Sequence, residues 1–135
     1  MHILKRTISR FSSCLILTLS LMMLFAKPVS AFTNYYFGGN VTTSFTRVSA
    51  AKTKITSSNA MPMVCFQACT TSGHTASFGV YKGGIYYSTI SHVPCDSVQY
   101  LFSYSVCEYG DSYELYGRID NAVSASDYIS GIWRP

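Results

Sequence analysis

The chain has 135 residues, of which 48% are hydrophobic, 15% aromatic and 12% charged, and its formal net charge is +4. Four of its ten lysine and arginine residues lie within the first 31 positions, so the remaining segment carries six basic and six acidic residues. This balance argues against nucleic acid binding, which needs clustered positive charge, and against a membrane-disrupting peptide, which needs a basic amphipathic helix.

Residues 1–31 predict a secretory signal peptide. They begin with the basic stretch MHILKRTISR, continue with the 13 uncharged residues CLILTLSLMMLFA and end on the small residues VSA. This order is typical of a secretory leader, and the apolar run is shorter than the roughly 20 residues of a membrane-spanning helix. We expect cleavage between Ala31 and Phe32, which leaves a secreted segment 32–135 without a membrane span. An uncleaved membrane anchor is the alternative.

Short stretches with strand-forming residues follow the leader. The stretch FTNYYFGGN (32–40) is expected to be a loose arm or an edge strand. Two Ser- and Thr-rich strands are then expected in NVTTSFTRVS (40–49) and KTKITSS (52–58), and a further strand over 62–70. TASFGVYKGGIYYSTIS (75–91) predicts two strands joined by a tight turn at its Gly-Gly pair, because glycine tolerates positive φ.

The rest of the chain continues the strand pattern. Apolar and polar residues alternate with a period of two in VQYLFSYSVC (98–107) and SYELYGRID (112–120), and the EYGD sequence between them predicts a hairpin. DYISGIWRP (127–135) predicts a closing strand. Seven or eight short strands without helical periodicity predict one all-β domain, an antiparallel β-sandwich or a small barrel.

Four cysteines remain after the leader is removed, and they predict two disulfides, as is usual for a small exported domain. If 62–70 is a strand, Cys65 and Cys69 lie about 13 Å apart, beyond the roughly 7 Å that a disulfide spans. The nested pairing Cys65–Cys107 with Cys69–Cys95 suits antiparallel segments better than Cys65–Cys95 with Cys69–Cys107. The spacing fits no common zinc module, so we expect a disulfide-stapled domain with no metal and no cofactor.

Few residues suggest catalysis. The stretch HVPCD (92–96) combines a histidine, a cysteine and an acid, which are the parts of an activated thiol. The partners in such sites usually converge from separate elements, so we interpret this stretch as a turn that carries a disulfide. His74 is expected in a solvated loop. We therefore predict no catalytic residue, and a small hydrolase that uses Cys95 or His92 is kept as an alternative.

Tyrosine is unusually frequent, since all 11 tyrosines lie in the segment 32–135. The consecutive tyrosines of Tyr86-Tyr87 point to opposite sides of a strand, so some rings are expected on the surface. Exposed tyrosines provide amphipathic contact area for a sugar ring or a partner protein, whereas filling of the core is the alternative. Tyr86, Tyr87 and Trp133 are the candidate binding surface.

The C-terminal sequence LYGRIDNAVSASDYISGIWRP (115–135) resembles the end of small exported all-β proteins of Gram-positive bacteria. These proteins are similar in having a long leader, a Ser/Thr/Asn/Tyr-rich body and a final sGxW strand, here residues 130–133. Their activity is largely unassigned, and some are encoded near bacteriocin-type export systems. We expect a secreted, non-catalytic protein that binds an extracellular protein, a glycan or an envelope component, and a bacteriocin-like or toxin-like protein is the alternative.

Overall fold

The computed structural model describes residues 33–56, 60–103, 107–121 and 126–135, and the regular secondary structure in these ranges consists of eight β-strands. The predicted leader and the cut between Ala31 and Phe32 lie outside the described residues. Among the described residues, no helix is long and apolar enough to cross a membrane. In chain order the strands are β1 (Tyr35–Val41), β2 (Thr46–Thr53), β3 (Met63–Cys69), β4 (Thr75–Lys82), β5 (Ile85–Pro94), β6 (Gln99–Leu101), β7 (Ser112–Ile119) and β8 (Asp127–Arg134).

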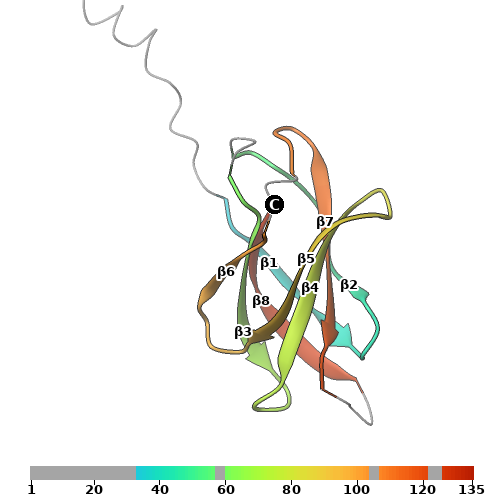
Figure 1. The fold of residues 1–135 in the computed structure, drawn as a ribbon, viewed down its shortest axis with the longest axis vertical. Helices are drawn as coiled ribbons and strands as arrows, with labels where there is room; N and C mark the ends of the chain where they lie inside the picture. Colours follow the sequence, from blue (N-terminus) through green and yellow to red (C-terminus); the bar gives the residue numbers. More distant parts are fainter. Residues whose placement is uncertain (1–32, 57–59, 104–106, 122–125) are drawn as a thin grey trace, which may run out of the picture.

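The strands form two four-stranded sheets, with the orders β1-β8-β3-β6 and β2-β7-β4-β5 (Figure 1). Every strand pairing is antiparallel. The prediction of an all-β, antiparallel fold of seven or eight short strands is therefore confirmed. The stretch expected as an arm or an edge strand is β1, which lies at the edge of its sheet and pairs with β8.

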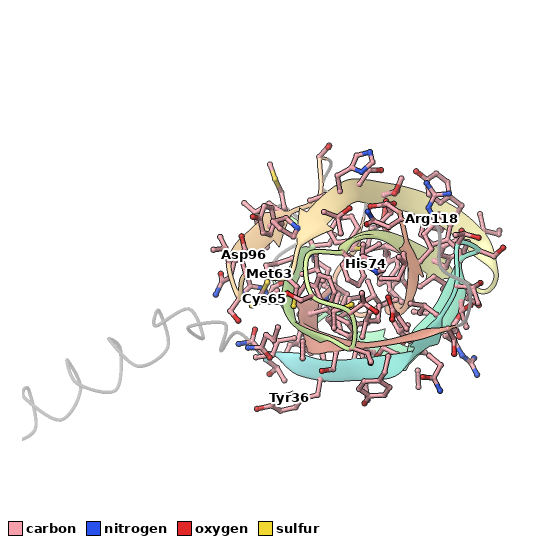
Figure 2. All side chains as sticks on the ribbon, turned by 90° about the horizontal axis from the view of Figure 1, so that it is seen from below. Tyr36, Met63, Cys65, His74, Asp96 and Arg118 are labelled. Atoms are coloured by element: carbon pink, nitrogen blue, oxygen red, sulfur yellow. The ribbon has the colours of Figure 1, made fainter. Side chains whose placement is uncertain are left out.

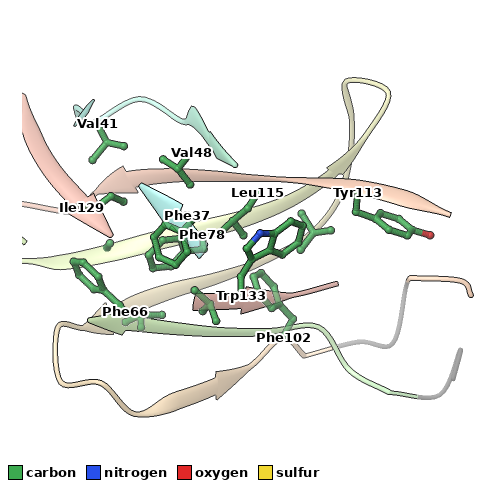
Figure 3. Packing of buried hydrophobic residues seen from close by; sticks show 14 of the residues in the cluster. Phe37, Val41, Val48, Phe66, Phe78, Phe102, Tyr113, Leu115, Ile129 and Trp133 are labelled. Carbon is green, nitrogen blue, oxygen red and sulfur yellow. The ribbon is translucent and has the colours of Figure 1, made fainter. Parts of the chain in front are cut away.

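The two sheets share one hydrophobic core (Figure 3). The ring of Phe78 on β4 lies 5.3 Å from that of Phe37 on β1 and 5.7 Å from that of Phe66 on β3, measured between centroids. These edge-to-face contacts join one sheet to the other, and this geometry is favoured for aromatic pairs. Alternation places every second residue of β7 in this core, as the sequence predicts.

Trp133 on β8 is completely buried in the same core. Its Nε1 donates a hydrogen bond to Oγ of Ser49 on β2, at 3.0 Å. A buried indole N–H needs such a partner, and here the partner comes from the other sheet. The prediction that Trp133 belongs to an exposed binding surface is therefore wrong, because Trp133 lies on the face of β8 that meets the other sheet.

The glycine pair between β4 and β5 makes the predicted tight turn. Gly83 and Gly84 have φ values of 57° and 79°, a left-handed conformation that glycine adopts with little cost. Two consecutive residues with positive φ are characteristic of the hairpin turn whose twist matches that of the flanking strands.

The predicted hairpin between 98–107 and 112–120 is wrong. Among the described residues of the first stretch, the strand is β6, which pairs with β3, whereas β7 belongs to the other sheet. Phe102 continues this association, because its N–H donates to the carbonyl of Pro62 at 2.9 Å. Phe102 and Cys107 are both buried in the shared core. Residues 104–106 lie outside the described residues.

Candidate functional site

The two predicted surface tyrosines of β5 separate onto different sides of the sheet. The ring of Tyr86 is 53% exposed and lies 5.7 Å from the ring of Tyr81. The ring of Tyr87 is 37% exposed and lies 5.8 Å from that of Tyr113, a core residue. A β-bulge between Val80 and Tyr81 sets this register. Tyr86 is therefore the member of the pair that faces outward.

A cluster of aromatic residues covers the outer face of the sheet β2-β7-β4-β5. Tyr81 lies at its centre, with its ring centroid 4.3 Å from that of Tyr116 on β7 and 5.7 Å from that of Tyr86 on β5. We call Tyr81, Tyr86 and Tyr116 the tyrosine face. Sequence analysis identified one of the three, because alternation alone does not tell which side of a strand is buried.

Gly79 permits the close packing of this cluster. A Cβ at this position would lie 2.9 Å from Cε2 of Tyr81 and 3.6 Å from Cε1 of Phe45. The absence of a side chain at Gly79 therefore lets the Tyr81 ring pack directly against the backbone of the sheet. Beyond it, the guanidinium carbon of Arg118 lies 5.0 Å from the Phe45 ring centroid, a distance that permits a cation–π interaction.

Charged groups border the tyrosine face. Nη1 of Arg47 on β2 lies 2.9 Å from Oε1 of Glu114 on β7, and Glu114 is the partner of Tyr81 in the strand register. The hydrogen bond and the charge of Glu114 raise the pKa of Arg47, so the guanidinium stays charged. The outer face thus combines aromatic rings with groups that both donate and accept hydrogen bonds.

The four cysteines of the described residues are free thiols, so neither predicted bridge is formed. Cys65 lies outside the core cluster and donates a hydrogen bond from Sγ to the Ser97 carbonyl at 3.3 Å. Cys107 is 1% exposed and packs inside that cluster. No bridge joins Cys65 to Cys107.

No bridge joins Cys69 and Cys95 either. Both are half-buried and pack against the edge of the core. Burial raises the pKa of the Cys69 thiol, and the charges of Asp127 and Cys95 raise it further. Burial and the charge of Asp96 likewise raise the pKa of Cys95. A raised pKa is the opposite of what an activated nucleophile requires.

The stretch HVPCD does not assemble a thiol site among the described residues. His92 is turned toward Asp120, whose Oδ2 lies 3.3 Å from its Nδ1, and its own side chain is 77% exposed. Asp96 instead accepts hydrogen bonds from the Tyr100 hydroxyl at 2.7 Å and from the Val98 N–H at 2.9 Å. His92, Val93 and Pro94 belong to strand β5, so the interpretation of this stretch as a turn holds only for Cys95 and Asp96, which follow the strand, and its disulfide is not formed.

His74 is not the solvated loop residue that the sequence predicts. Its side chain is 18% exposed, and its Nδ1 lies 2.7 Å from Oδ2 of Asp127, whose side chain is 7% exposed. Cys69 belongs to the same cluster, because its Sγ lies 3.9 Å from that carboxylate oxygen. Cys69 and His74 are separated from Asp127 by more than 50 positions, so spacing along the chain carries no signal of this cluster.

Comparison of the chain with protein-family models, with curated proteins and with solved structures finds no match.

Proposed function

We propose that this is a secreted, non-catalytic protein that binds an extracellular glycan through the tyrosine face. One observation carries the proposal: Tyr81 contacts the rings of both Tyr86 and Tyr116 on the outer face of a sheet, beside the ion pair of Arg47 and Glu114. The signal peptide pattern of residues 1–31 supports export to a compartment where envelope and extracellular polysaccharides are found.

The chemistry of the tyrosine face suits a sugar. Aromatic rings offer a flat apolar surface with a polar hydroxyl at one edge, and a pyranose has an apolar C–H face with hydroxyls around its rim. Arg47 supplies donors and Glu114 supplies acceptors for such hydroxyls. A binding surface that is mainly apolar, with a few placed polar groups, is the usual design for small ligands.

The area of the tyrosine face also favours a glycan over a protein partner. Three aromatic side chains bury at most about 450–750 Å² when they are fully covered, and two of these rings are already half-buried in the sheet. A standard protein–protein interface buries about 800 Å² on each partner. The face is therefore small for a stable protein interface and adequate for one or two sugar units.

We also propose that the two sheets form a β-sandwich. The contacts of Phe78 with Phe37 and with Phe66 across the core support this proposal, as does the sharing of one core by both sheets. Of the two alternatives for the function, the hydrolase is disfavoured by the raised thiol pKa values. The antimicrobial alternative stays a prediction from the sequence resemblance.

The proposed function is tested by measuring whether the exported protein is retained on a panel of insoluble polysaccharides and on a glycan array. We expect at least one glycan to be bound, and Tyr116→Ala and Tyr86→Ala each to weaken that binding by about 2- to 10-fold, because an aromatic contact contributes about 0.5–1.5 kcal/mol. The matched control is Tyr36→Ala, since Tyr36 is 81% exposed and projects from the opposite side of the molecule (Figure 2).

Three outcomes would overturn the proposal. The first is that no glycan is retained, and the second is that the two tyrosine-face variants bind as the unaltered protein does. The third is that Tyr36→Ala causes the same loss as Tyr116→Ala, which would place the binding surface elsewhere. Circular dichroism of each variant shows that the strands are intact, so that a loss of binding reports on the surface.

A further inference from the structure

We propose that Cys69, His74 and Asp127 form a site for a divalent transition-metal ion, with zinc as the preferred ion. The three side chains each offer one donor atom, and these atoms all lie within 4.8 Å of one another. They come from the end of β3, the connection between β3 and β4, and the start of β8. His74 lies near the middle of the end of the molecule that Figure 2 shows from below. This proposal is independent of the proposed glycan binding.

Backbone pairing holds the three elements together. Cys69 is the partner of Ile129 in the β3–β8 register. One step beyond the strand, the N–H of Thr70 donates to the Tyr128 carbonyl at 3.0 Å, and the N–H of Tyr128 donates to Oγ1 of Thr70 at 3.2 Å. These contacts fix the start of the β3–β4 connection against the residue that follows Asp127, so the cluster is preorganised by the sheet.

The carboxylate of Asp127 is oriented as metal-binding carboxylates commonly are. Its Oδ1 accepts a hydrogen bond from Oγ1 of Thr71 at 2.7 Å. This contact leaves Oδ2 as the common neighbour of His74 Nδ1 at 2.7 Å and of Cys69 Sγ at 3.9 Å. Hydrogen bonds from neighbouring residues typically hold metal ligands in this way. Thr71 is therefore a positioning residue for the proposed site.

The donor set and its charge suit zinc. Thiolate sulfur, imidazole nitrogen and carboxylate oxygen are the three side-chain donors found in zinc sites. A thiolate and a carboxylate together carry two negative charges, which a divalent cation neutralises in this largely buried position. Binding releases the Cys69 thiol proton to solvent and displaces the hydrogen between His74 Nδ1 and Asp127, so that Nδ1 binds the ion and the imidazole carries one proton, on Nε2.

The spacing requires only a small adjustment. In a tetrahedral site with bonds of about 2.0–2.3 Å, ligand atoms are roughly 3.3–3.8 Å apart. The longest separation in the cluster must therefore shorten by about 1 Å, and the His74–Asp127 contact must open by less than that, since the ion takes the place of the shared hydrogen. With three protein ligands, a solvent molecule completes the coordination, as in an open zinc site.

A disulfide between Cys69 and Cys95 would remove the thiolate from this site. The metal and the predicted bridge therefore exclude each other, and the site belongs to the protein with both thiols free. Two consequences follow for the metal-loaded protein. It resists formation of the Cys69–Cys95 bridge, and its Cys69 reacts more slowly with an alkylating reagent than Cys69 in the metal-free protein does.

The test is a titration of the reduced, full-length exported protein with Co²⁺ and then with Zn²⁺. We expect a sulfur-to-cobalt charge-transfer band that Zn²⁺ abolishes, and a rise in Tm with added Zn²⁺, because a ligand that binds the native state stabilises it. Cys69→Ser is expected to remove the band. His74→Ala is expected to weaken binding by at least about tenfold, and Thr71→Val by about 10- to 100-fold, which is the usual effect of removing a partner of a metal ligand.

Matched controls come from the other cysteine and histidine environments. Cys65→Ser and His92→Ala are expected to retain the cobalt band, because neither residue belongs to the cluster. The proposal is overturned if no band appears, if Cys69→Ser keeps it, or if the two controls lose it. Thr71→Val leaves all three donor atoms in place, and alkylation of Cys69 is measured on the unaltered protein, so these readouts decide the question even if Cys69→Ser does not fold.

Discussion

Titration of Cys107 is expected to lower the stability of this protein at alkaline pH. The residue is 1% exposed, and burial raises the pKa of its thiol from 9.0 to about 11, with the positive charge of Lys54 opposing the shift and the charge of Asp111 adding to it. The native state therefore keeps its proton on this sulfur at pH values where the unfolded chain has lost it.

The sign and the size of the effect follow from linkage. Below about pH 9 the thiol of Cys107 is protonated in both states, so it adds no pH dependence. Between about pH 9 and 11 the native state binds more protons than the unfolded state, and the free energy of unfolding falls as the pH rises. Since one pKa unit corresponds to about 1.4 kcal/mol, the total loss above pH 11 is about 3 kcal/mol.

Urea unfolding of the reduced protein, compared with Cys107→Ala, measures this term. The alanine variant is less stable at neutral pH because it leaves a small cavity, but its free energy of unfolding lacks the Cys107 titration. Tyrosines and lysines titrate in both proteins, so their contributions cancel in the comparison. We therefore expect the free energy of unfolding of the unaltered protein to fall by about 3 kcal/mol relative to that of Cys107→Ala from about pH 8 to pH 11.5. A difference in the free energy of unfolding that stays constant over this range would refute the reasoning.

Two further predictions concern packing, and both are measured by urea unfolding. In Gly131→Ala, the new Cβ would lie 2.1 Å from the backbone oxygen of Cys65, so we expect a loss of about 3 kcal/mol or more. Gly117→Ala is the control, because its nearest neighbour, at 2.9 Å, is the end of a flexible side chain; an equal loss in both variants would contradict the assignment. Trp133→Phe removes the buried donor to Ser49, and we expect a loss of about 2–4 kcal/mol. Ser49→Ala is expected to cost less in the Trp133→Phe background than alone, and strictly additive losses would argue against this hydrogen bond.

Local patterns in the sequence were sufficient to predict most strands. Alternation with a period of two predicted β7, DYISGIWRP predicted β8 as a closing strand, and the Gly83-Gly84 pair predicted the turn between β4 and β5. These features are local because pleating alternates successive side chains and because positive φ is tolerated by glycine. The length of strand β6 was overestimated, since the alternation of 98–107 continues beyond the residues that pair with β3.

The candidate binding surface was predicted only in part. The abundance of tyrosine indicated that some rings are exposed, and Tyr86 is indeed on the outer face. Tyr81 and Tyr116 were missed, and Trp133 was assigned to the surface although it is buried. A period of two divides a strand into two faces, but it does not say which face meets the other sheet. Only the packing of the sheets makes that choice.

The sequence by itself determined the strand-forming segments, the tight glycine turn and the expectation of export, because each of these depends on residues that are neighbours along the chain. The tertiary structure alone decided which strands pair, which sulfur lies beside which charge, and that His74 meets Asp127 across 53 positions. The physical reason is that such contacts are selected by burial of the whole apolar surface in one shared core. Their free energy belongs to the assembled sheets and not to any single segment.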